Sequence, residues 1–389
     1  MIEESCRSGA VCQLSAEGDG EWLLCVIAKR TYLITSGGEC VPDDEQVPLV
    51  LEPVRSPEDR NMLVRDIELI PLKPRTDVVL HGHAYTGGDP CAALEVSLRV
   101  GRHEKRVLVL GDRHCALSST GRILISEPEL FEAMPLTFAR AYGGRDCGAE
   151  EVHGNPFAVF ERYLEGTSIR ASNQSPYLYP RNPCGKGYLM EAKSGAVERC
   201  EMPNIEDPFD RLTPERMLVG DPERWVEMPL PQSYGWVNWG WFPRAAFAGI
   251  QQVFDKQRLS SMPEIERGLL SRELLKVERQ EDLAIESLRR FGNGASLDMQ
   301  LPHLVGGEEV ELSHLHPIER RLRFAIPAPP RRMCIDGREG KLIPTRPVLH
   351  TVSIEPDISR LTLTWRGSGH ARRPYTPVEL ASMPLLVEW

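Results

Sequence analysis

The feature that most constrains the fold of this chain is an aromatic run that glycine and proline interrupt. Residues 229–249, PLPQSYGWVNWGWFPRAAFAG, hold three of the seven tryptophans of the chain. This spacing of glycine and proline excludes one long regular helix or strand. Two uses remain open. The run fills the core of an irregular domain, or it presents rigid aromatic area to a partner. In the second case the partner-binding residues are Trp236, Trp239, Trp241 and Arg244.

The first third of the chain has the period-two pattern of β-strands. Residues 93–100, ALEVSLRV, alternate so that Leu94, Val96, Leu98 and Val100 share one face. A turn leads to RVLVL at 106–110, and the pair predicts an antiparallel hairpin buried on one face. The apolar segment 22–34 predicts another strand. Residues 1–135 are therefore expected to form a β-rich lobe, a sandwich or a barrel-like sheet.

The rest of the chain divides by composition into three further segments. Turn pairs such as Asn155-Pro156 and Asn182-Pro183 make residues 136–260 a loop-rich, aromatic middle, with one short helix expected at 156–164. The amphipathic pattern of 263–290 predicts a helical insertion over 261–295. Strand patterns return over 296–389, which we expect to pack with the N-terminal lobe as one unit. The fold class is mainly β, either all-β or α+β.

Charge and cysteine content restrict the partners and the compartment. The net charge of −10 argues against binding to nucleic acid or to an anionic membrane. No apolar run is long enough to span a bilayer, and the polar N-terminus lacks the apolar core of a signal peptide, so a cytoplasmic protein is expected. The ten cysteines form no CxxC pair and are expected to be thiols in that compartment.

Two histidine pairs are the only candidates for a metal site. In a strand, His81-x-His83 would place both imidazoles on one face, which is half of a metal site, and His103 or His114 would have to add a third ligand. His314-x-His316 raises the same possibility. There is no HExxH motif, zinc ribbon or calcium loop. Structural or surface histidines are favoured, and neither a metal nor a cofactor is expected.

Other candidates for catalysis lack a partner group in the sequence. Cys184 adjoins glycines and a lysine, but activation of its thiol needs a base that no local pattern supplies. Gly143-Gly144 offers backbone N–H groups to an anion, although a tight turn is favoured. The adjacent carboxylates Glu206 and Asp207 do not set the separation that a glycosidase needs. We expect no enzyme. A carbohydrate-binding domain, with Trp236 or Trp239 as the stacking platform, is the main alternative, and a hydrolase is the less favoured one.

An ordered series of short blocks resembles one known family. The blocks include KPRTDV at 73–78, GDR at 111–113, MPLTFARAYGG at 134–144, PNIE at 203–206, YGW at 234–236 and WFPR at 241–244. In this order they are similar to the type VI secretion adaptor family found beside VgrG and PAAR-domain effector genes. The resemblance extends from about Leu24 to Gly367.

This resemblance implies a cytosolic adaptor or chaperone without catalytic residues. Such a protein holds a secreted effector, often one with a PAAR domain, and helps to load it onto the VgrG spike. The implied partners are therefore the effector and, for direct contact, VgrG. The sequence leaves the identity of the effector, the stoichiometry and the oligomeric state open.

Overall fold

The fold is described from a computed structural model. It covers residues 9–15, 22–154, 177–192, 197, 200–247, 260–269, 290–336, 342–371 and 373–389. The helix expected at 156–164 and most of the helical pattern 263–290 lie outside these residues. The prediction of a mainly β protein is confirmed, because strands dominate the described chain and helices are few and short. No helix within the described ranges has the length and apolar character needed to cross a membrane.

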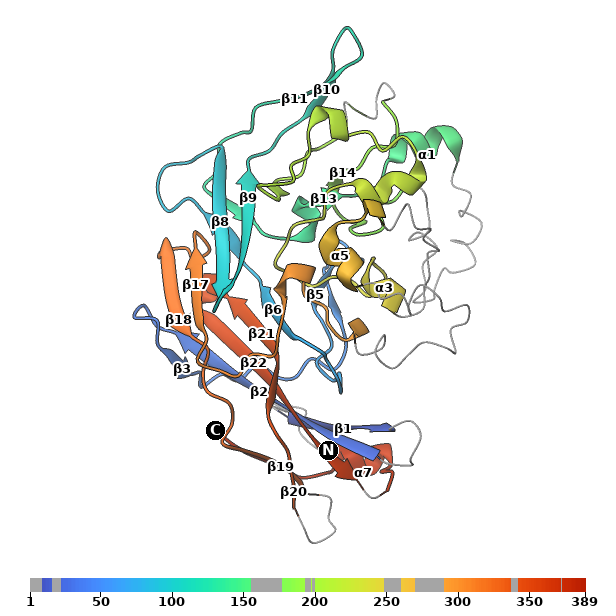
Figure 1. The fold of residues 1–389 in the computed structure, drawn as a ribbon. Coiled ribbons are helices and arrows are strands. Elements are labelled where there is room, and N and C mark those ends of the chain that lie inside the picture. Colours follow the sequence, from blue (N-terminus) through green and yellow to red (C-terminus); the bar gives the residue numbers. More distant parts are fainter. Residues whose placement is uncertain are drawn as a thin grey trace.

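The largest sheet has seven strands and joins the two ends of the chain (Figure 1). Its order is β1-β2-β22-β21-β6-β16, and β3 pairs with the far end of β2. β22 pairs with β2 along twelve residue pairs, from Trp22↔Ala371 to Leu33↔Arg360. The bounds are β1 Gly9–Ser15, β2 Trp22–Ile34, β3 Cys40–Pro42, β6 Thr76–Leu80, β16 Gln300–Leu301, β21 Val348–Glu355 and β22 Arg360–Ala371. Segments from the first and last quarters of the chain therefore form one sheet.

A second sheet of five strands contains the predicted hairpin. Its order is β15-β9-β8-β17-β18, with all pairs antiparallel. Val96, Leu98 and Val100 of β8 are buried, whereas the alternate positions are at least partly exposed, as the period-two pattern predicts. The bounds are β8 Ala93–Val100, β9 His103–Leu110, β15 Ile205–Glu206, β17 Glu309–Ser313 and β18 Arg321–Ala325.

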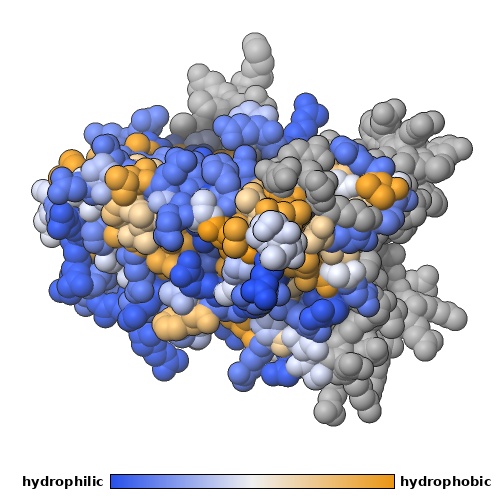
Figure 2. Space-filling model, turned by 90° about the horizontal axis from the view of Figure 1, so that it is seen from above, coloured by the Kyte–Doolittle hydropathy of each residue, from blue (hydrophilic) through white to orange (hydrophobic). Residues whose placement is uncertain are grey.

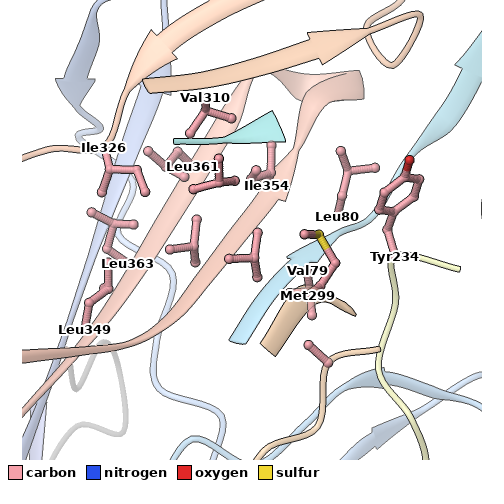
Figure 3. Packing of buried hydrophobic residues seen from close by; sticks show 14 of the residues in the cluster. Val79, Leu80, Tyr234, Met299, Val310, Ile326, Leu349, Ile354, Leu361 and Leu363 are labelled. Atoms are coloured by element: carbon pink, nitrogen blue, oxygen red, sulfur yellow. The ribbon is translucent and has the colours of Figure 1, made fainter. Parts of the chain in front are cut away.

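The main hydrophobic core lies where these two sheets meet. Side chains from β17, β21, β22 and β6 pack together there, and Tyr234 closes one end (Figure 3). β22 differs from a half-exposed strand, because Leu361 to Gly367 are all buried. Its outer face is covered by the loop that carries Glu68, which accepts a hydrogen bond from Thr364 Oγ1 at 2.6 Å. Thr364 thus faces a buried polar partner rather than water.

Small strand pairs complete the framework. β19 (Arg332–Asp336) pairs with β20 (Leu342–Pro344) and with β23 (Leu385–Glu388), next to α7 (Pro377–Ala381). The remaining pairs are β4 (Val54–Arg55) with β5 (Leu63–Arg65), β7 (His83–Tyr85) with β12 (Ala133–Pro135), β10 (Cys115–Leu117) with β11 (Ile123–Ile125), and β13 (Tyr142–Gly143) with β14 (Lys186–Gly187).

The loop-rich middle has its own buried cluster. Tyr179, Tyr188, Met202, Met217 and Trp225 belong to it, and their aromatic rings meet edge-on or tilted. Short helices lie around the cluster: α1 (Cys147–His153), η1 (Phe138–Arg140), η3 (Pro214–Arg216), η4 (Pro222–Glu227), α3 (Arg244–Phe247) and α5 (Glu264–Leu269). With η6 (Leu297–Met299), α5 lies between the strands and this lobe (Figure 1).

Candidate functional site

The aromatic run connects the two hydrophobic cores. Tyr234 and Trp236 belong to the core between the sheets, whereas Phe242 and Phe247 belong to the loop-rich cluster. The backbone follows the same path, since Leu80 N–H donates to Tyr234 O at 2.9 Å and Phe242 N–H donates to Pro180 O at 3.0 Å. Residues 234–247 therefore join the β framework to the loop-rich lobe.

Trp236 and Trp241 are buried within this connection. Trp236 is 4% exposed and forms bridge pairs with Leu63 and Ala295. Trp241 is fully buried, and its ring meets Phe138 edge-on at 5.3 Å between centroids. Neither ring is available to a partner or a sugar in this structure, because other parts of the chain already cover both faces.

Trp239 and Arg244 are held by one carboxylate. Trp239 Nε1 donates to Asp66 Oδ1 at 2.7 Å, and Arg244 Nη2 lies 2.7 Å from Asp66 Oδ2 without hydrogen-bond alignment. Arg244 also donates to the backbone oxygens of Val237 and Phe291, at 2.9 Å each. Trp239 is half-buried and Arg244 is 3% exposed. Trp236, Trp241 and Arg244 are therefore part of the core and its polar contacts, whereas Trp239 stays partly exposed. Partner binding by these four residues stays a prediction.

The same run nevertheless lines a cavity at the junction of the two cores. The cavity has a volume of about 200 Å³. Most of its wall is apolar, and six lining residues come from the aromatic run: Leu230, Pro231, Gln232, Val237, Phe242 and Pro243. Ile265 of α5 and Leu297 of η6 complete the apolar wall. The cavity is therefore formed by segments far apart in the chain, which the folding of both cores brings together.

Two ion pairs lie in the wall of this cavity. Arg181 and Glu266 are both at most 1% exposed, and the guanidinium Nε lies 2.7 Å from Oε1. In the second pair, Lys105 Nζ donates to Asp298 Oδ1 at 2.9 Å and to Ser296 Oγ at 3.1 Å. Buried charges with opposite partners hold their elements in one geometry, because separation would leave a charge without solvent. We infer a preformed cavity.

Two polar groups in the cavity wall are little used by the protein. Gln232 is 7% exposed, and its one described hydrogen bond is a weak one of 3.4 Å from Nε2 to Leu230 O. Asp207 is the one charged lining residue with no opposite charge among the described residues. Its Oδ1 accepts only the Phe209 N–H, at 2.8 Å. Buried polar groups such as Gln232 usually have partners, so its free oxygen is available to a ligand. Asp207 is partly exposed, and its carboxylate is available to a positive charge.

The two glycine segments meet but do not form an anion site. β13 and β14 pair in parallel and place Gly143-Gly144 beside Gly185-Lys186-Gly187, along a hollow of about 410 Å³. The N–H groups of Gly144 and Gly185 both donate to Asn182 O. A Cβ on Gly144 would lie 2.4 Å from Gly185 O, and φ there is +98°. The glycines therefore serve close backbone packing between β13 and β14, rather than the tight turn that the sequence favoured.

Cys184 and Glu206 both have partners within the folded chain. Burial raises the pKa of the Cys184 thiol well above its ordinary value, and a hydrogen bond with Asp59 and the charge of that carboxylate raise it further. A thiol held in its protonated form is a poor nucleophile. Glu206 is buried against Arg113 and also accepts from Leu212 N–H at 3.3 Å, whereas its neighbour Asp207 faces the cavity.

The two histidines of each pair do not point together toward a shared ligand position. β6 ends at Leu80 and the next strand begins at His83, so His81 and His83 do not share a strand face, contrary to the prediction. Burial, and then the charge of Arg65, lower the pKa of His81 to about 4. His83 Nδ1 instead lies 2.7 Å from Asp357 Oδ2.

His314 and His316 also contact different partners. His314 Nδ1 lies 2.9 Å from Tyr85 O, and His316 Nε2 lies 3.3 Å from Ser359 Oγ. Within the described part of the chain, no group of three or more histidine, cysteine, aspartate or glutamate side chains is arranged to hold a metal ion.

No local sequence pattern indicates the junction cavity. Its lining comes from β9, η1, the aromatic run, α5 and η6, so no single spacing reveals it. The predicted binding residues of the run are three tryptophans and Arg244, none of which lines this cavity. Its lining comes from their smaller neighbours, such as Leu230 and Val237.

Together, the fold and the cavity define a mainly β protein in which a loop-rich lobe meets a two-sheet core at a cavity lined by both. The chain belongs to the bacterial family described as "Uncharacterized protein conserved in bacteria (DUF2169)", whose model matches residues 19–366. Comparison with curated proteins and with solved structures found no match.

Proposed function

We propose that this protein is a type VI secretion adaptor that binds an effector and helps to load it onto the VgrG spike. In this proposal the effector carries a PAAR domain, the adaptor acts in the cytosol, and it catalyses no reaction. The ordered blocks that resemble such adaptors extend from Leu24 to Gly367, and the family match covers nearly the same residues, 19–366.

The observation that carries the proposal is the junction cavity. It is preformed, mainly apolar and about 200 Å³ in volume, which is smaller than most small-molecule sites. Partner-binding energy in protein interfaces is concentrated where a side chain enters such a pocket. The upper face of the molecule, where the β10–β11 hairpin projects, adds hydrophobic area among mostly hydrophilic residues (Figures 1 and 2). Leu124, on β11, is 53% exposed.

The proposal is tested by producing the PAAR-domain effector encoded beside this gene with and without this protein. We expect the effector to stay in the supernatant and to co-elute with this chain during size-exclusion chromatography. Immobilised VgrG should then retain the effector only when the adaptor was present during synthesis. An effector that remains in solution and binds VgrG equally well in the absence of this chain contradicts the proposal. An effector from an unrelated secretion system serves as the control and should gain nothing.

A further inference from the structure

The geometry of the junction cavity points to a specific ligand chemistry. We infer that it binds one apolar side chain of a partner polypeptide that carries a lysine or arginine within one or two residues. This inference rests on the proposed function and describes the segment that the partner offers.

The volume and lining of the cavity select the apolar side chain. An apolar cavity of about 150 Å³ is large enough to hold benzene. About 200 Å³ therefore accommodates one aromatic ring or one branched aliphatic side chain, but not a larger ligand. Phe138, Phe242 and Leu297 line the space and offer contacts to such a side chain. Burial of such a side chain removes apolar surface from water and so favours the complex.

The carboxamide of Gln232 indicates that this side chain belongs to a polypeptide. A carboxamide has one acceptor oxygen and two donor hydrogens, so it can pair with a peptide group on both sides. Gln232 is 93% buried, and its oxygen accepts no hydrogen bond from the described residues. A backbone amide next to the inserted side chain would satisfy both ends of this carboxamide. A hydrocarbon ligand would leave them unused.

Asp207 selects the basic neighbour. Lys105 and Arg181 already have carboxylate partners at Asp298 and Glu266, whereas Asp207 has no opposite charge among the described residues. A lysine or arginine on the partner would complete this pair. The net charge of the chain, −10, favours the same sign of partner charge.

The turn after Asp207 extends the binding surface away from the cavity. Phe209 is 85% exposed, the most exposed large hydrophobic side chain among the described residues. The same loop continues to residues 211–214, which line a surface groove of about 460 Å³ beside β11. A polypeptide that inserts one side chain into the cavity therefore has exposed apolar surface on which to continue.

The first experiment selects binders of the purified full-length protein from a phage-displayed library of random heptapeptides. We expect enriched sequences to hold Leu, Ile, Met or Phe one or two positions from Lys or Arg. No enrichment, or enrichment of an apolar residue with acidic neighbours, overturns the inference.

The second experiment measures the affinity of one enriched peptide for variants by fluorescence anisotropy. Val237→Phe fills the cavity and should weaken binding at least about ten-fold. The matched control Val378→Phe makes the same change at a position that is 78% exposed on α7, and it should leave the affinity unchanged. Equal affinity of the two variants overturns the inference.

A third variant, Asp207→Asn, tests the charge and does not depend on filling the core. It should weaken binding roughly three-fold at about 0.05 M salt, and the difference should vanish near about 0.5 M salt. Asp44→Asn makes the same change at an exposed aspartate that lines neither the cavity nor the groove, and it should bind like the unchanged protein. Loss of affinity in Asp44→Asn equal to that in Asp207→Asn contradicts the assigned charge partner.

The effector of the preceding subsection separates this inference from the proposed function. If the effector co-elutes equally with the unchanged protein and with Val237→Phe, the cavity is not its binding site, and the adaptor function stands. If no effector binds the unchanged protein, the adaptor function fails, and peptide selection alone decides on the cavity.

Discussion

The buried ion pair between Arg181 and Glu266 should be among the most sensitive points of the protein. The two side chains are joined by two contacts, with Nε 2.7 Å from Oε1 and Nη2 2.5 Å from Oε2. Arg181 also donates to the backbone oxygens of Trp225, Val226 and Met228. These bonds hold the guanidinium in place, so it cannot turn toward water when Glu266 is removed.

Glu266→Ala therefore leaves an uncompensated charge inside the loop-rich core. Removal of one partner of a buried pair lowers the free energy of unfolding by about 3–5 kcal/mol. Against the total stability of about 5–15 kcal/mol that is usual for a domain, this loss is large. Urea denaturation followed by tryptophan fluorescence measures it. Trp225 reports locally, since its ring centroid lies 4.8 Å from the Arg181 guanidinium carbon.

The control is the exposed pair Arg224–Glu227, in which the side chains are 60% and 40% exposed. Glu227→Ala should lower the free energy of unfolding by less than about 1 kcal/mol, because water screens the pair. Equal losses for Glu266→Ala and Glu227→Ala would show that α5 is not held by a desolvated ion pair. In that case the cavity would not be preformed by this ion pair.

Three further perturbations have defined outcomes. In thermal denaturation, Gly144→Ala should lower the free energy of unfolding by about 1–3 kcal/mol more than Gly121→Ala. Both positions have positive φ, but only at Gly144 would the new Cβ lie 2.4 Å from a backbone oxygen. Equal losses would refute the close packing. Iodoacetamide at pH 8 should modify the exposed Cys147 well before Cys184, because the raised pKa of Cys184 keeps its thiol protonated. Peptide mass spectrometry measures the two rates, and equal rates would contradict the raised pKa. The pKa of His81 is about 4 in the folded protein, against an ordinary value of 6.5. Between these pH values only the unfolded chain binds the proton. About 3 kcal/mol of stability, fully present above pH 6.5, should therefore be lost as the pH falls to about 4. His81→Leu should flatten that part of the urea-midpoint profile, and an unchanged profile would exclude His81 as its source.

Local patterns predicted the strands well. The alternation in residues 93–100 located β8 residue by residue, because one face of that strand is buried and the other is not. The apolar segment 22–34 likewise coincides with β2. Both patterns are properties of neighbouring residues, which a single sequence displays directly.

The roles of the tryptophans could not be predicted in the same way. Tryptophan suits both a core and an interface, and contacts distant in sequence decide between them. Trp239 depends on Asp66, 173 positions away, and Trp241 packs against Phe138. Glu266 lies 85 positions from Arg181, so their pairing in the wall of the cavity could not be predicted from local patterns either. The sequence contains these residues but does not show which of them meet.

The pairing of β2 with β22 has a consequence for synthesis of the protein. Leu33 pairs with Arg360, more than 300 residues later. At about 5–20 residues per second, the ribosome makes that intervening chain in roughly 15–65 s. Until then, the apolar strand Trp22–Ile34 lacks its longest neighbour, and such late pairing slows folding and exposes the nascent chain to aggregation. A chain that stops before Arg360 never forms this pairing, so premature termination anywhere in the first nine-tenths should yield material for degradation rather than a smaller working protein.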